Sequence, residues 1–254
     1  MRPRDRADAG RVSSKPLEIK GVLKDTWHLY RTLFLRSFLT GFIVFAALGV
    51  FEVSRYLSAL IGFVGTTLVQ GALVEVVDDE HRGKAPRGLG ELYRRSGKRL
   101  GAMLWASVLM GIGVGVGLVL LIVPGILLAI RWAVAIPIVM LEGLGARAAM
   151  RRSKELVQGH RRDVFRVLAN IWVRTGVAWI LCSLFIGAVA SGTSHPALTI
   201  WFGGVLAGAL VTPYAAHALN VVYYRLTEPD RPILPEQPEH AWSSVWREQD
   251  AAES

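Results

Sequence analysis

The chain has 254 residues, of which 52% are hydrophobic and only 19% are charged, and its formal net charge is +9. A soluble domain of this length usually carries about a quarter charged residues, and here the apolar residues gather in runs long enough to cross a bilayer. The composition therefore argues against a soluble globular protein and indicates an integral membrane protein. The positive charge does not require nucleic acid as a partner, because Lys and Arg collect in the cytoplasmic loops of membrane proteins.

The first 16 residues are polar, offer almost nothing to bury, and are expected to be disordered in the cytoplasm. They lack the pattern of a cleaved signal peptide. The lone cysteine, Cys182, excludes a disulfide within the chain.

Next comes a stretch, 17–37, whose apolar residues recur at steps of three and four, as in an amphipathic helix lying in the membrane interface.

Pro124 and Gly125 are expected to form the turn between two spans, and Pro137 is a possible kink. Residues 17–227 are predicted to form the membrane domain, and 228–254 an acidic, Pro-rich cytoplasmic tail in which Trp242 and Trp246 either dock a short helix or stay disordered. The six predicted spans are 34–51, 56–77, 101–122, 126–141, 167–189 and 198–223.

Lys and Arg fall almost entirely on one side of these spans. Two further basic helices are expected before the third and fifth spans, at 89–104 and 143–165. The segment before the first span and the second and fourth connections hold 22 Lys and Arg, whereas the opposite connections hold only Arg55. The positive-inside rule then places both termini in the cytoplasm. The predicted fold is an all-α transmembrane bundle, with six spans in three hairpins and basic amphipathic helices on the cytoplasmic side.

The hairpins also suggest a weak internal repeat. Three times the sequence offers a basic helix, a span, a short turn with little charge and a returning span, starting near Leu17, Leu89 and Gly145. A true threefold repeat is one interpretation. The periodicity that any six-span protein shows is the other, and the sequence does not decide between them.

A distinctive motif occupies the centre of the chain. A Pro-Gly turn precedes an apolar span with an aromatic residue, then an acidic residue, then a helix of the pattern A-x-x-R-S-x-x-L-x-x-G. In these positions the chain resembles a family of bacterial multi-pass membrane proteins, the glycerophosphoryl diester phosphodiesterase membrane domain. The resemblance implies the bacterial inner membrane and a membrane module without the enzyme, since 228–254 is too short for a catalytic domain. The motif residues are Pro124, Gly125, Trp132, Glu142, Ala149, Arg152, Ser153, Leu156 and Gly159.

Two arginines, Arg131 and Arg174, fall inside predicted spans, where a central charge costs about 2.5–3.5 kcal/mol. One hypothesis is a polar pocket open to the cytoplasm, in which Arg174 and His217 face Glu75. The other is a set of structural ion pairs between helices, which the sequence favours. The residues considered for the pocket are Arg131, Arg174, Glu75, His217, Asn170, Gln70 and Asn220.

Two further motifs have plainer interpretations. The run 78–81 (Asp-Asp-Glu-His) resembles a metal site, but consecutive residues at a helix end point in different directions, so a solvated loop is expected. The glycines of 111–117 follow no strand and lack a neighbouring Lys, so they predict close helix packing instead of a phosphate loop. No cofactor and no metal are expected.

The basic helices give the strongest functional prediction. Several Lys and Arg beside a span attract anionic lipid, although the same residues also serve to set topology. We therefore expect a non-enzymatic membrane module acting through lipid or protein contacts, with a homo-oligomer as one option, and a small transporter with a polar pocket as the alternative. The predicted lipid contacts are Arg147, Arg151, Arg152, Lys154, Arg94, Arg95, Lys98 and Arg99.

Overall fold

The computed structural model describes residues 18–49, 55–85 and 87–233, and within these ranges the regular structure is helical and contains no strand. The predicted all-α class is confirmed. The expectations for the disordered N-terminus, for the connection at 50–54 and for Trp242 and Trp246 lie outside the described residues. The helices are α2 (Ile19–Thr32), α3 (Phe34–Gly49), α4 (Arg55–His81), α5 (Leu89–Leu120), α6 (Ile122–Arg131), α7 (Ala135–Leu141), α8 (Ala146–Val157), α9 (Arg161–Ser191) and α10 (Pro196–Thr227).

Four segments of the described chain are long and apolar enough to cross a membrane: α5, α6 with α7, α9 and α10. The helices α2 and α3 meet at an angle of 74° and together give a fifth candidate. Backbone hydrogen bonds continue through this bend, from Leu33 to Leu29 and from Ser37 to Leu33. The chain thus has several apolar helices of membrane-spanning length, in agreement with the last four predicted spans.

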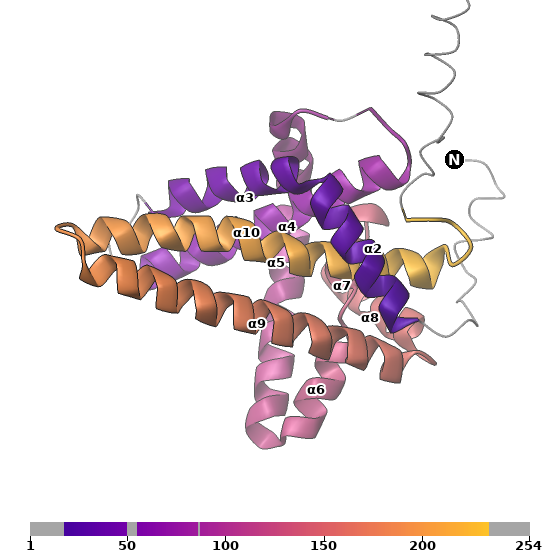
Figure 1. The fold of residues 1–254 in the computed structure, drawn as a ribbon. Helices are drawn as coiled ribbons and strands as arrows, with labels where there is room; N and C mark the ends of the chain where they lie inside the picture. Colours follow the sequence, from indigo (N-terminus) through magenta and orange to yellow (C-terminus); the bar gives the residue numbers. More distant parts are fainter. Residues whose placement is uncertain (1–17, 50–54, 86, 234–254) are drawn as a thin grey trace, which may run out of the picture.

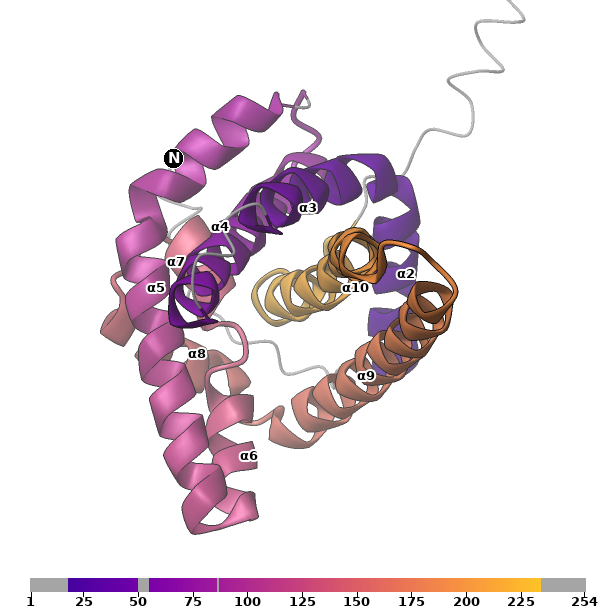
Figure 2. The ribbon, with the colours of Figure 1, turned by 90° about the vertical axis from the view of Figure 1, so that its left-hand side faces the viewer.

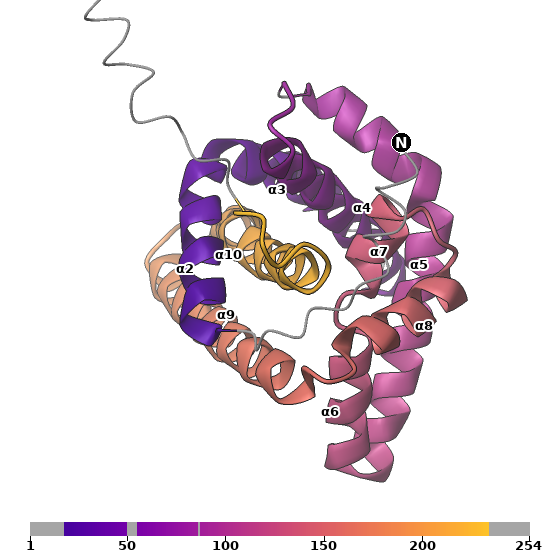
Figure 3. The same cartoon turned by 90° about the vertical axis from the view of Figure 1, so that its right-hand side faces the viewer.

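The helix α10 lies at the centre of the structure, where it packs against α9, α3, α2 and α4. In Figure 1, α3, α9 and α10 run alongside one another, whereas the α5–α6 hairpin projects across their direction. Viewed along α10, Figure 2 shows the same hairpin extending to one side. The six spans in three hairpins therefore stay a prediction. Figure 3 shows α2, α7, α8 and the C-terminal end of α10 gathered on one side.

The turn expected at Pro124 and Gly125 lies three residues earlier. α5 ends at Leu120, and Leu121 takes an extended conformation that starts α6 at Ile122. Pro124 is tolerated as the third residue of α6, because the N–H groups of a first helical turn have no partner inside the helix. Gly125 packs closely on α5, since a Cβ added to Gly117 would lie 2.8 Å from the Cα of Gly125.

Two other helix boundaries lie at positions that differ from the predicted ones. The break expected at Pro137 lies at 132–134, and Pro137 occupies the first turn of α7. The predicted basic helix 143–165 is divided, because α8 ends at Val157 and α9 begins at Arg161. Gly159 between them has φ +99°, a left-handed conformation that favours glycine. The last five residues of the predicted basic helix therefore belong to the long helix α9.

The buried apolar residues form one cluster around the C-terminal halves of α4 and α10 and the short helices α7 and α8. Leu29, Leu92, Ile138, Leu156 and Leu226 are fully buried members of this cluster, at 1% exposure or less. By contrast, large apolar side chains are exposed on α5, α6 and α9, as expected of a surface that faces lipid. The packed end of the molecule carries the polar residues described next.

Candidate functional site

The C-terminal turn of α4 carries three buried ionisable side chains. Asp78, Asp79 and His81 are exposed by only 5%, 1% and 1%, and the helix continues through His81. The solvated loop predicted for 78–81 is therefore wrong. The prediction failed because cations four to eight residues away fold back onto the two carboxylates and groups about 150 residues away pack against Asp78 and His81. Buried charges are tolerated only when paired in this way.

Arg87 links two of the acidic side chains of α4. Its Nη1 donates to Glu75 Oε2 at 2.7 Å, and its Nε donates to both Asp79 oxygens at 2.8 Å. The hydrogen bonds to Asp79, together with the charge of Glu75, raise the pKa of Arg87 above its ordinary value against the effect of burial. Arg36 of α3 donates to the Arg87 carbonyl at 2.7 Å. The connection between α4 and α5 is thereby fastened to both α4 and α3.

Asp78 joins α4 to α10. Its carboxylate accepts hydrogen bonds from Arg82 Nε at 2.5 Å, Lys84 Nζ at 2.9 Å and the Tyr224 hydroxyl at 2.9 Å. A buried carboxylate with two cations and a hydroxyl has its charge and most of its acceptor positions satisfied. This pairing explains how an aspartate is tolerated inside the core.

His81 connects α4 to the residues after α10. Its Nδ1 donates to the Ile233 carbonyl at 2.9 Å, its Nε2 lies 3.3 Å from Glu228 Oε2, and its ring lies 4.0 Å from that of Tyr224. Arg231 donates to the His81 carbonyl at 3.2 Å. The hydrogen bond with His81 lowers the pKa of Glu228 below its ordinary value, against the effect of burial. We call the whole assembly the polar cap, which comprises Glu75, Asp78, Asp79, His81, Arg82, Lys84, Arg87, Tyr224, Glu228 and Arg231.

The polar cap has a structural role, because its ion pairs and hydrogen bonds join α4 to neighbouring parts of the chain. Its carboxylates are already bound to arginine, lysine, tyrosine or histidine, and no group of His, Cys, Asp and Glu among the described residues is arranged to hold a metal ion. A sequence signal for the cap exists in the run of acidic residues that ends an apolar segment. Its partners could not be read from the sequence, because Tyr224 and Glu228 lie about 150 residues away.

The structure places the predicted pocket residues apart from one another. Glu75 pairs with Arg87, and the nearest oxygen–nitrogen distance to Arg95 is 4.0 Å. Arg174 is exposed on α9, where its guanidinium donates to the Tyr214 hydroxyl at 3.4 Å. His217 is fully buried, and its Nε2 lies 2.9 Å from the Ser37 hydroxyl. The contact of Glu75 with Arg174 and His217 that the hypothesis requires is not the pairing that these residues adopt.

The other pocket candidates occupy separate positions. Arg131 lies at the end of α6, its Nε is buried without a partner within the described chain, and its carbonyl accepts a hydrogen bond from Ser153 at 2.9 Å. Asn170 and Gln70 are half-buried on α9 and α4. Asn220 is 1% exposed, and neither atom of its amide has a partner among the described residues. The buried polar side of α10 is therefore formed by His217 and Asn220.

Most of the predicted lipid contacts are at the surface. On α5, Arg94, Arg95, Lys98 and Arg99 are exposed, and both Arg94 and Arg95 pair with Glu91 of their own helix. Arg99 also donates to the Val139 carbonyl at 3.4 Å. On α8, Arg147, Arg151 and Lys154 are exposed, whereas Arg152 is half-buried and lies 3.5 Å from Glu142. The three exposed residues of α8 follow the i, i+4, i+7 spacing of one helix face.

The exposed apolar helices and the packed polar end together define a helical membrane protein. Residues 105–212, from within α5 to within α10, match the family described as the membrane domain of glycerophosphoryl diester phosphodiesterase. A UPF0259 membrane protein of Pectobacterium carotovorum subsp. carotovorum (strain PC1) is 30% identical over 131 residues, which cover 50% of this chain and 48% of that protein. No solved structure matches.

These matches confirm the family resemblance predicted from the central motif. The matched segment contains that motif, including Pro124, Glu142 and Gly159. The chain spans about half the length of the curated relative it matches. Neither description names a catalytic activity of the matched segment.

Proposed function

We propose that this chain is a non-enzymatic membrane module that binds anionic lipid headgroups through its basic surface helices and so supports membrane or envelope organisation. The observation that carries this proposal is the division of α8 into two faces. One face is buried, and the other presents Arg147, Arg151 and Lys154 to the surface without an ion pair among the described residues. The buried face consists of Ala146, Ala149, Ser153, Leu156 and Val157.

Such a helix fits the surface of a membrane that contains anionic lipid. Each Lys or Arg near that surface is worth about 1 kcal/mol of attraction. The buried face fixes α8 against α5, α6 and α7, so the basic stripe keeps one orientation relative to the apolar helices. By the positive-inside rule we assign this side, and both termini, to the cytoplasm of a bacterial inner membrane.

The test of the lipid role removes the basic stripe. The full chain carrying R147Q, R151Q and K154Q, purified in mild detergent, is expected to retain at least about twofold less phosphatidylglycerol relative to phosphatidylethanolamine than the wild type. The matched control, R147K with R151K, keeps all three charges and should retain the wild-type ratio. An unchanged ratio in the triple variant would refute a lipid role for this helix.

The orientation is tested separately by labelling cysteines in whole cells. In a C182S background, S194C lies in the turn before α10 and should react with a membrane-impermeant maleimide from outside. R151C on α8 should react only after the cells are opened. Labelling of R151C in intact cells, or protection of S194C, would reverse the assignment.

A transporter with a polar intramembrane pathway is the second candidate, and one observation favours it. His217 and Asn220 are polar residues buried on one side of α10, and polar groups inside membranes frequently mark substrate or ion pathways. The test is the reaction of N220C, in the C182S background, with a small water-soluble thiol reagent. Fast labelling would show a water-filled cavity, whereas labelling no faster than that of the neighbouring L219C would leave interhelical packing as the role of this side.

A further inference from the structure

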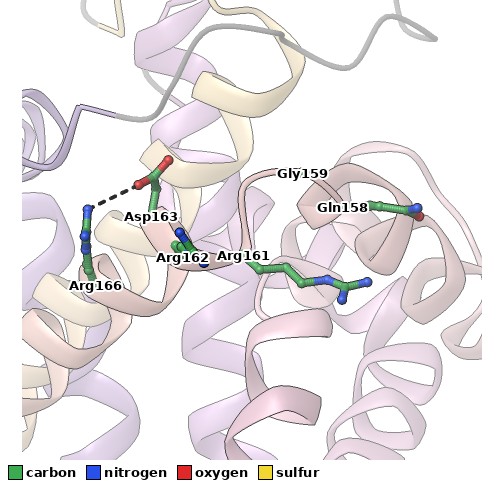
Figure 4. A pocket seen from close by; sticks show the side chains of 6 residues that line it. All are labelled: Gln158, Gly159, Arg161, Arg162, Asp163 and Arg166. Carbon is green, nitrogen blue, oxygen red and sulfur yellow. Dashed lines mark ion pairs between the residues drawn. The ribbon is translucent and has the colours of Figure 1, made fainter.

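The turn between α8 and α9 forms an open cleft of about 730 Å³ lined mainly by arginine. Its lining residues are Gln158, Gly159, Arg161, Arg162, Asp163 and Arg166. Figure 4 shows Arg161 extending on the side of Gln158, while Asp163 and Arg166 lie on the other side of Arg162. The cleft is therefore strongly basic, with three guanidinium groups and one carboxylate. We call it the elbow cleft.

The backbone fixes the shape of this cleft. Gly159 adopts φ +99°, a left-handed conformation that ends α8, and the His160 N–H donates to the Val157 carbonyl at 3.0 Å. His160 and Val164 are buried, so the first turn of α9 is anchored on its inner side. The arginines of the elbow cleft thus project from a packed turn.

The electrostatics of the elbow cleft suit a phosphate group. Guanidinium groups bind phosphate oxygens through paired hydrogen bonds. The first N–H groups of α9 also lie here; no side chain caps this end, and the end of a helix where these groups are exposed favours an anion. Asp163 neutralises only part of the charge, because its Oδ1 lies 3.7 Å from Arg166 Nη1 and the Arg166 side chain is 62% exposed.

The position of the elbow cleft indicates where its phosphate comes from. Immediately after the cleft, α9 presents a series of exposed apolar side chains that begins with Phe165 at 43% and Trp172 at 55%. A long exposed apolar face on a helix of membrane-spanning length is the surface that acyl chains cover. A phosphate in the cleft would therefore lie at the headgroup level above those chains.

From this juxtaposition we propose that the elbow cleft is a discrete binding site for the phosphate of one anionic phospholipid, whose acyl chains lie along α9. Arg162 binds the phosphate oxygens, while Arg161 and Gln158 border the headgroup on one side and Arg166 borders it on the other. The proposal rests on the proposed lipid-binding function, which it narrows to a defined site. It concerns residues other than the basic stripe of α8, so the two can be tested independently.

The experiment counts lipids bound to the full chain by native mass spectrometry after delipidation in mild detergent. The wild type is expected to retain one phosphatidylglycerol, with phosphatidylcholine bound at least about tenfold more weakly. R161Q with R162Q should lower the occupancy by phosphatidylglycerol about tenfold or more, because the contacts of Arg162 with the phosphate and the charge of Arg161 beside the headgroup are lost. R161K with R162K, which keeps the charge and removes the paired geometry, should give an intermediate loss.

The control is K20Q with K24Q, which removes two exposed charges from α2 and should leave the single bound lipid in place. An equal loss in this control would overturn the discrete site while supporting the general lipid role, and full retention by R161Q with R162Q would overturn the elbow cleft itself. Displacement of the lipid by millimolar inorganic phosphate would assign the cleft to a soluble anion instead. Circular dichroism of each variant separates a lost site from a lost fold, and where the Gln variant does not fold, the lipid occupancy of the Lys variant decides between these outcomes.

Discussion

The two helices of the last hairpin are similar in length and composition and yet occupy opposite environments. In the most apolar stretch of α9 only 6% of the residues are buried within the protein, whereas in that of α10 the share is 61%. α10 is surrounded by α2, α3, α4 and α9, while α9 lies at the side of the molecule (Figure 1). Within a membrane, lipid tails are as apolar as leucine, so hydrophobicity alone does not decide which helix lies inside.

The polar and small residues show what distinguishes the two helices. α10 places Gly208 and Ala209 against Phe45 and Gly41 of α3, and it buries polar groups such as Tyr224 that bind α4. α9 instead carries its arginines at the surface, at its beginning and at Arg174. Close backbone contact and paired polar groups therefore hold α10, whereas most apolar side chains of α9 remain exposed.

The largest expected effect is the loss of a buried ion pair in the polar cap, the part of the molecule where α4 binds α10. R87M leaves Asp79 and Glu75 without their shared cation, and an uncompensated buried charge costs about 3–5 kcal/mol. The matched change on α9 is R166M, which removes an exposed pair worth under about 1 kcal/mol. Thermal unfolding in detergent should separate the two variants clearly. Equal unfolding temperatures would contradict the claim that the polar cap contributes more stability than the exposed ion pair of α9.

The next effect concerns packing. G41L is expected to destabilise the protein by about 1–3 kcal/mol, because a Cβ at Gly41 would already lie 3.2 Å from the backbone Cα of Ala209. G176L on α9 is the control, since no atom lies within 4 Å of the added Cβ. Stability of the two variants is compared by the same unfolding measurement. If G41L is as stable as G176L, α3 and α10 can move apart without loss of stability.

A smaller effect is expected on acidification. The pKa of Glu228 is lower in the folded state than its ordinary value, first because of its hydrogen bond with His81. The stabilisation is therefore complete above the unfolded pKa of about 4.3 and is lost as the pH falls through the lower folded value. Hydrogen exchange should then increase at the C-terminal end of α10 and less at α9. In E228Q this difference between pH 6 and pH 3.5 should shrink.

The smallest effect is expected for R174L. Arg174 is exposed and makes one long hydrogen bond, to Tyr214, so its loss should change the unfolding free energy by less than about 0.5 kcal/mol. H217L leaves the buried Ser37 hydroxyl without its partner and should cost about 1–2 kcal/mol. A large loss of unfolding free energy in R174L would indicate that this arginine lies in the protein interior, as the predicted polar pocket requires.

Much of the fold follows from local features of the sequence. Apolar runs of about 20 residues predict helices because every backbone polar group in lipid must be satisfied within the segment, and α5, α9 and α10 agree with that prediction. The three- and four-residue periodicity of 17–37 likewise predicts α2. Gly159 ended a recognisable motif, but the sequence did not show that its conformation would divide one basic helix into α8 and α9.

The basic residues were found as a class from the sequence, because the asymmetry of Lys and Arg is a property of composition. Their individual roles were not. Arg87 was counted only among topology-setting charges, and in the structure it is the centre of the polar cap. The sequence leaves Glu75 open to a pocket with Arg174 or to a structural ion pair, and in the structure Arg87, twelve residues away, pairs with it.

The sequence alone determined that this chain is helical, largely apolar and asymmetric in its charges, because these depend on the transfer of each segment from water to lipid. Only the tertiary structure decided that α10 is central, that α9 is peripheral and that the acidic end of α4 is buried. Those outcomes depend on which side chains far apart in the sequence come within hydrogen-bond distance. Asp78 has Arg82 and Lys84 nearby in the sequence, but only the fold brings the Tyr224 hydroxyl to its carboxylate and buries it.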